Sequence, residues 1–200
     1  MLKKVGIVKR NTKSYEVFNK CISDDFLKIE KMKSSEYIKE CWDRYCKSSH
    51  QNNSLNGSIF EYIIISEMYR QSIYPMYLQA QIAFVPNVKF DVLLYTDEEI
   101  PIGISLKTSL RERYKQADLE AAALKNVHRL AKNYLITLNK KEAETVNEKI
   151  KNKIILGLND VVVAIDSEFD VLVEELKKKN LIKPEKDNII TAGNVVENKF

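Results

Sequence analysis

The sequence predicts an α/β protein with a central mixed sheet of five strands flanked by helices. Short apolar runs typical of strands alternate with segments of helical periodicity, in the order α–β–β–β–α–β–α–β–α. The composition is that of an ordinary folded protein, with 44% hydrophobic residues and few Gly and Pro. No internal repeat or long linker interrupts this order, so we expect the 200 residues to form one domain.

The first part of the chain predicts helices. Residues 1–33 carry scattered apolar positions among lysines, which favours short helical pieces. Residues 34–47 begin with a serine pair that can cap a helix and continue with apolar residues at helical spacing. The polar residues 50–57 indicate a loop, and residues 57–71 then predict a helix with one apolar stripe.

Five short apolar runs bounded by turn residues predict the strands. These runs cover residues 76–85, 89–96, 101–107, 134–138 and 160–165. Further helices are expected at 114–131 and 140–153 and from Ser167 onward. We divide the domain into a helical N-terminal part (1–56), a catalytic core (57–178) and a lysine-rich, then polar, C-terminal tail (179–200).

Charge and cysteine content exclude several classes of protein. The net charge of +4 is compatible with a polyanionic partner but does not establish one. Three cysteines without a CxxC pair, and two histidines, give no zinc-site spacing and favour free thiols in a reducing compartment. No apolar run is long enough to span a bilayer and no signal peptide is recognisable, so we expect a cytoplasmic protein with no membrane partner.

A candidate active site lies on two consecutive strands and the helix after them. Alternate residues of a strand share a face, so Ser105 and Lys107 point the same way, and Asp91 on the neighbouring strand can converge with Lys107. Gln116 and Glu120 form one helical ridge that can return toward this end of the sheet.

These residue types suit the hydrolysis of a phosphodiester bond. Asp91 and Glu120 offer the carboxylate oxygens that Mg²⁺ prefers, and a bound metal polarises a phosphoryl oxygen and acidifies water. Lys107 can stabilise the developing charge or orient the attacking water. Ser105 belongs to this catalytic set as a small residue at the site rather than as a nucleophile, because no histidine lies nearby in sequence.

The D…SxK pattern of Asp91, Ser105 and Lys107 resembles the PD-(D/E)xK nuclease superfamily, found mostly in type II restriction endonucleases. The usual third acid is replaced by Ser105, as in a subgroup that carries its acid on the following helix, and Glu120 lies 13 residues after Lys107. Phe90 stands where the motif name has proline. The resemblance covers about residues 57–138 and implies a restriction-endonuclease-like fold in a prokaryotic, cytoplasmic protein.

The resemblance also implies an activity and further site residues. It implies Mg²⁺-dependent cleavage of double-stranded DNA that leaves 5′-phosphate ends, and a glutamate on the helix before the catalytic strands that tunes the metal site, here Glu61. Cutting both strands of a palindrome requires two active centres, so we expect a homodimer or a tetramer.

A second motif, Arg111–Glu112–Arg113, follows the catalytic lysine. Arginine can bind guanine bidentately and a carboxylate can accept from cytosine, so this set, with Gln116 beside it, is the predicted DNA-binding element. In the similar subgroup an R(D/E)R element reads a CC/GG step. The resemblance therefore implies a short G·C-rich palindrome, such as CCGG or an interrupted CC…GG site.

Structural interpretations of the same residues remain open. Asp91 can simply end its strand, Lys107 can be an edge-strand lysine, and Glu120 can be a solvated helix residue or an ion-pair partner. Glu61 can be structural rather than a metal ligand, and the RER motif can be an ordinary charged helix start. Two rival functions are another PD-(D/E)xK nuclease, repair or structure-specific, and a non-catalytic DNA-binding protein.

Overall fold

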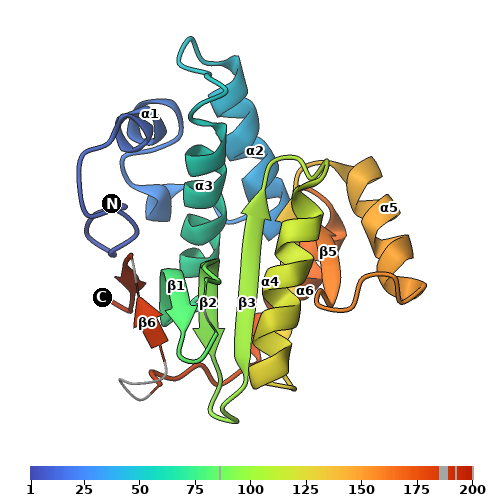
Figure 1. Cartoon of the computed structure of the whole chain (residues 1–200). Helices are drawn as coiled ribbons and strands as arrows, with labels where there is room; N and C mark the ends of the chain where they lie inside the picture. The colour runs from blue at the N-terminus through green and yellow to red at the C-terminus, as the bar shows by residue number, and fades with distance from the viewer. Residues whose placement is uncertain (86, 185–188, 192, 200) are drawn as a thin grey trace.

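The computed structural model in Figure 1 describes residues 1–85, 87–184, 189–191 and 193–199. The helices are α1 (Lys13–Cys21), the 3₁₀ helix η1 (Phe26–Lys28), α2 (Ser34–Lys47), α3 (Asn56–Arg70), α4 (Arg113–Val127), α5 (Lys140–Lys151) and α6 (Ser167–Lys177). The strands are β1 (Met76–Ile82), β2 (Phe90–Tyr95), β3 (Pro101–Lys107), β4 (Lys132–Thr137), β5 (Asp160–Val163), β6 (Ile189–Thr191) and β7 (Val195–Val196).

The strands form one mixed sheet in the order β5-β4-β3-β2-β1-β6, with β7 also paired to β1. Strands β1, β2 and β3 are an antiparallel meander, whereas β3, β4 and β5 run parallel. Parallel neighbours need a crossover, and here α4 and α5 supply it. The predicted α/β class with a central mixed sheet flanked by helices is therefore confirmed.

The sheet is larger than the five strands that we expected. All five expected strands are present, although the first ends at Ile82 and the last at Val163. The two additional strands come from the C-terminal segment, which the sequence indicated only as a tail, and both pair with β1. Their short length explains why periodicity did not reveal them. The part of that tail at residues 185–188, 192 and 200 lies outside the described residues.

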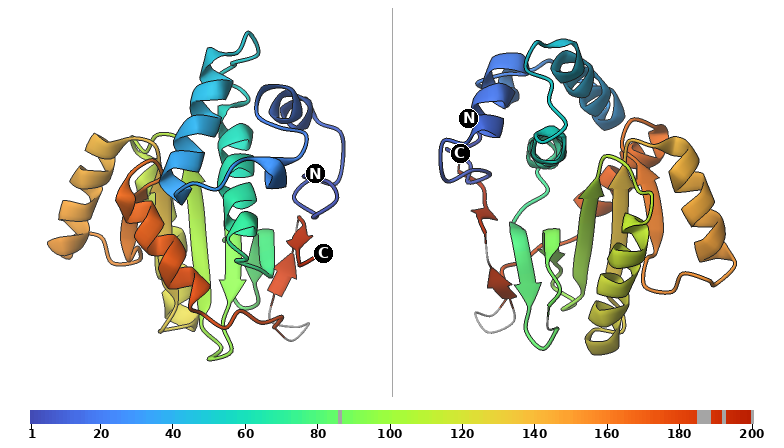
Figure 2. Two further views of the ribbon diagram at one scale, coloured as in Figure 1. Left: turned by 180° about the vertical axis from the view of Figure 1, so that it is seen from behind. Right: turned by 45° about the horizontal axis from the view of Figure 1, so that its top comes forward.

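Helices cover both faces of the sheet, as Figure 2 shows from two further directions. On one face, α1, α2, α3 and α6 enclose the largest core, which includes Val92, Ile104 and Leu106 of the sheet. On the other face, α4 and α5 pack over residues such as Leu135 and Val161. The alternation along β3 places Leu106 in the first core, so its neighbours Ser105 and Lys107 face the other way.

The predicted helices occur with small differences at their ends. Ser34 is the first residue of α2, and α4 begins at Arg113, within one residue of the expected start, but ends at Val127 because the chain turns into β4. Among the residues that the structure describes, no helix has both the length and the apolar character needed to cross a bilayer.

Two glycines give opposite expectations for a Gly→Ala change. A Cβ at Gly103 of β3 would lie 2.6 Å from the ring of Phe90 and 2.8 Å from Asn133 Oδ1, so Gly103→Ala is expected to lower the free energy of unfolding by about 1–3 kcal/mol. Gly57, in the first turn of α3, has no atom within 4 Å of such a Cβ, and Gly57→Ala is expected to add about 0.4–1 kcal/mol. Urea unfolding of both variants and of the parent protein measures these changes. Equal unfolding midpoints for the two variants would contradict both expectations.

Candidate active site

The centre of the site is a contact between Asp91 of β2 and Lys107 of β3. The ammonium of Lys107 donates to Asp91 Oδ2 at 2.8 Å, and the backbone N–H of Leu106 donates to the same oxygen at 2.7 Å. The register that pairs Val92 with Ile104 brings these strand ends together, as the sequence predicted. The Asp91 side chain is 12% exposed and that of Lys107 is 29% exposed, so the pair is partly shielded from water.

Glu61 reaches the same place from α3, on the other side of the β3 end. Burial, and to a smaller extent the negative charge of Asp91, raise the pKa of the Glu61 carboxyl to about 7, against the opposing effect of Lys107 and Lys89. Glu61 makes no hydrogen bond or ion pair with any residue that the structure describes. A half-buried acid with a strongly raised pKa beside a second carboxylate is typical of a functional site.

Glu120 approaches from α4. Burial raises the pKa of the Glu120 carboxyl, while a hydrogen bond from Gln116 Nε2 at 2.8 Å and the positive charge of Lys107 lower it. The negative charge of Asp91 raises this pKa as well, so Glu120 lies within electrostatic range of the Asp91–Lys107 pair without bonding to it. The structure thus brings Asp91 and Lys107 into contact and places Glu61 and Glu120 around them.

Whether a divalent cation can bind at this site depends on how the carboxylates are placed around Lys107. Within the described part of the chain, no three His, Cys, Asp or Glu side chains lie close enough together to hold a metal ion. The donor chemistry nevertheless suits Mg²⁺, because Glu61 and Glu120 are carboxylates within electrostatic range of Asp91 and Lys107, and a bound cation would favour the ionised form of both acids, whose pKa values burial raises. The residues that would hold such an ion are Asp91, Glu61 and Glu120, whose side chains would have to move closer together to bind it.

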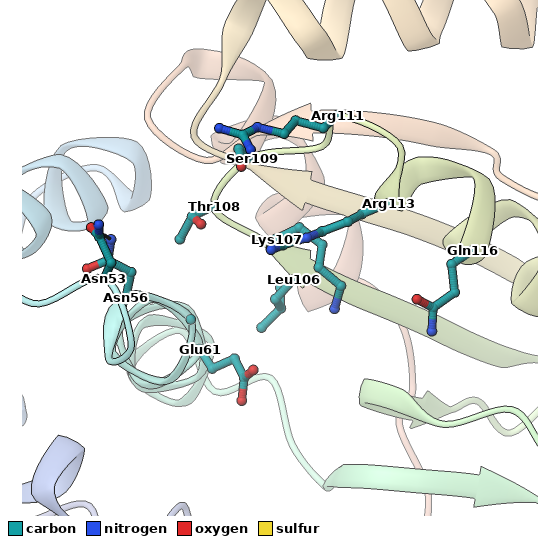
Figure 3. A pocket seen from close by; sticks show the side chains of 11 residues that line it. Asn53, Asn56, Glu61, Leu106, Lys107, Thr108, Ser109, Arg111, Arg113 and Gln116 are labelled. Atoms are coloured by element: carbon teal, nitrogen blue, oxygen red, sulfur yellow. Dashed lines mark hydrogen bonds between the residues drawn. The ribbon is translucent and has the colours of Figure 1, made fainter.

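Figure 3 shows the cavity of about 670 Å³ that opens beside this group. One wall is the β3–α4 segment, from which Arg111 and Arg113 point toward the opposite side of the cavity. The other wall is α3 and the loop before it, with Asn53 and Asn56 at the rim. The complete lining is Asn53, Asn56, Gly57, Glu61, Leu106, Lys107, Thr108, Ser109, Arg111, Arg113 and Gln116.

The RER motif lies at the start of α4 and is solvent-exposed. Arg111 has a backbone φ of +40°, a left-handed conformation that is strained for an arginine, and Arg113 begins the helix with its N–H bonded to Leu110 O at 2.6 Å. Glu112 forms an ion pair with Lys115 and does not line the cavity. The two arginines therefore share the cavity with Lys107, while Glu112 points elsewhere.

Some residues around the site were not identified from the sequence. Gln79 of β1 donates from Nε2 to Asp91 Oδ1 at 3.0 Å, and nothing in the apolar run of this strand singles it out. Asn53 and Asn56 lie in a segment that composition indicated only as a loop. The hydroxyl of Tyr45 in α2 donates to Asn56 Oδ1 at 2.9 Å, at the start of α3, and to Asn52 O at 3.0 Å, which holds the loop before α3 against α2. Only the fold brings these residues to the site.

Ser105, predicted as part of the site, is buried on β3 and faces away from the core that surrounds Leu106. Within the described part of the chain, Ser105 makes no hydrogen bond with a histidine. Its role as a small residue of the active site stays a prediction.

Comparisons with known proteins give one distant likeness. No family model matches the sequence, and no curated protein matches it. A solved structure described as a restriction endonuclease PspGI–substrate DNA complex superposes with a TM-score of 0.47 and 18% identity, over 86% of this chain and 78% of that chain. A likeness at this level assigns no activity to the chain.

Proposed function

We propose that this protein is a Mg²⁺-dependent, site-specific endonuclease for double-stranded DNA. The observation that carries the proposal is the contact between Asp91 and Lys107, with Glu61 and Glu120 held around it, at the edge of a cavity lined by two arginines. Carboxylates and a lysine with a nearby cationic wall are what hydrolysis of a polyanionic backbone requires. The D…SxK resemblance described above supports the same chemistry.

The roles of the side chains follow from their positions. Asp91, Glu61 and Glu120 would hold the cation, which, when bound, supplies polarisation of the phosphoryl oxygen and a more acidic water. Lys107 lies beside Asp91 and donates its ammonium protons to the phosphate oxygens on which negative charge develops. Arg111 and Arg113 face the cavity, from where they can neutralise phosphates or reach base edges.

The direct test is incubation of the purified protein with plasmid DNA and MgCl₂, followed by sequencing of the ends. Discrete fragments that disappear with EDTA support a site-specific, metal-dependent enzyme, and 5′-phosphates at a shared sequence define the site. Smearing, or cutting only at junctions, favours a repair or structure-specific nuclease. Binding without cleavage in any divalent metal favours a non-catalytic DNA-binding protein and contradicts the proposal.

The arginines provide a test of base recognition. If Arg111 and Arg113 each contact a guanine, as the proposed G·C-rich palindrome requires, replacement of either by Ala should weaken specific binding by about 1–3 kcal/mol and relax the sequence preference at one position. Lys115→Ala, an exposed residue of the same helix turn that does not line the cavity, is the matched control. Titration of specific and random duplexes separates base contacts from phosphate contacts, since loss of a phosphate contact weakens both equally.

Two active centres are needed to cut both strands of a palindrome, so the proposed enzyme acts as a homodimer or a tetramer. Sedimentation of the free and DNA-bound protein measures this directly.

A further inference from the structure

Asp91 is held by three hydrogen bonds that come from two neighbouring strands. Oδ2 accepts from the Leu106 N–H and from Lys107, whereas Oδ1 accepts from Gln79 Nε2 at 3.0 Å. A carboxylate has about four acceptor positions, two on each oxygen, so these donors fill Oδ2 and leave one position on Oδ1. The hydrogen bond from the Gln79 amide therefore determines in which direction the remaining acceptor position of Oδ1 points.

The backbone of Gln79 is unusual for a residue inside a strand. Its φ is +50°, in the left-handed region, where a non-glycine residue is strained. Strain of this kind persists only where the surrounding structure enforces it, and it is concentrated at functional sites. Because Gln79 lies in the middle of β1, the distortion redirects the side chain without ending the strand.

The C-terminal segment accommodates the distortion. Tyr77 pairs with Val195 of β7, and Ala80 pairs with Thr191 of β6, so β1 has two residues between these pairs and the C-terminal segment has three. At this irregularity, a Cβ on Gly193 would lie 2.5 Å from Leu78 O and 3.1 Å from Gln79 Cβ. Only a glycine permits this close approach beside Gln79.

We propose that Gln79 is a positioning residue for Asp91, and that the distortion of β1 beside Gly193 directs its amide to the carboxylate. Gln79 orients the carboxylate for the cation and the substrate; it does not contact either. This inference rests on the proposed nuclease function for its kinetic consequence, but the hydrogen bond itself can be tested without any activity.

The test compares Gln79→Met, which keeps the length of the side chain and removes its donor, with Gln81→Met in the same strand, where no contact with Asp91 is lost. Gln79→Asn keeps an amide and tolerates the left-handed backbone, but it is one methylene too short to reach Asp91. We expect both Gln79 variants to reduce the single-turnover cleavage rate about tenfold or more, with the DNA dissociation constant unchanged. Gln81→Met should cleave like the parent protein.

The second readout is the amide resonance of Leu106, whose N–H bonds to the same carboxylate. It should move in both Gln79 variants and stay in place in Gln81→Met, while the Leu78 amide, bonded to Asn194 O, reports that β1 remains paired. An unmoved Leu106 amide, or normal cleavage by Gln79→Met, overturns the inference. If the parent protein cleaves no DNA, the proposed function fails, and the Leu106 resonance alone decides whether Gln79 positions Asp91.

Discussion

Replacement of Lys107 by Met is expected to reduce the rate of DNA cleavage about 10²–10³-fold while leaving the protein folded. Lys107 is the cation that contacts Asp91, at 2.8 Å, and the proposed mechanism has no second ammonium in that position. The change also leaves Asp91 without its ion-pair partner, but the carboxylate keeps its bonds to Gln79 and Leu106. Because the pair is partly exposed, we expect a stability loss of about 1–2 kcal/mol at most.

Lys89→Met is the matched control for this experiment. Lys89 is an exposed lysine close enough to influence the charge of Glu61, but it does not contact Asp91. Single-turnover kinetics on a duplex with the cleavage site, together with urea unfolding of each variant, separates a catalytic effect from a folding defect. Normal cleavage by Lys107→Met would remove the basis of the proposed active site.

The second large effect concerns Glu61 and pH. Since the pKa of this carboxyl is raised from 4.5 to about 7 in the folded protein, the folded state binds more protons than the unfolded state between these values. Ionisation of Glu61 therefore lowers the free energy of unfolding. This loss of stability is absent below about pH 4.5, grows between about pH 4.5 and pH 7, and is complete above about pH 7. The full penalty is at most about 3 kcal/mol, and residual solvent around the half-buried side chain reduces it.

Glu61→Gln removes this penalty, so the variant should gain stability relative to the parent protein as the pH rises from 5 to 8. Urea unfolding in EDTA at several pH values measures the difference in unfolding free energy between Glu61→Gln and the parent protein. The other titrating groups are the same in both proteins, so their contributions cancel in this difference. Glu98→Gln, in the exposed turn between β2 and β3, controls for the loss of one charge. Parallel stability curves for Glu61→Gln and the parent protein would contradict the expectation. A cation held by Glu61 should also stabilise the parent protein more than the variant at pH 8.

The contact at the centre of the site was predictable because it depends on short-range rules. Asp91, Ser105 and Lys107 lie on two strands joined by a tight turn, so the alternation of side chains and the hairpin register suffice to bring the aspartate and the lysine together. Helical spacing likewise predicted the side of α4 from which Glu120 comes within electrostatic range of that pair. The five longer strands were predicted from their apolar runs.

Gln79 and the loop asparagines were not predictable, because their positions depend on contacts between distant segments. Gln79 reaches Asp91 only through a left-handed backbone inside β1, and local propensity does not indicate such a distortion at a glutamine. Strands β6 and β7 have three and two residues, too few for alternation to distinguish them from a polar tail. Their pairing with β1 is a property of the completed sheet.

The position of β6 and β7 has a consequence for shortened versions of this chain. These strands cover the outer hydrogen-bonding groups of β1, the strand that supplies Gln79. A truncation before residue 189 would uncover those backbone groups and create an open template to which other molecules can add their own strands. Such a product would be expected to aggregate, and its inactivity would therefore be no measure of whether the last residues take part in catalysis.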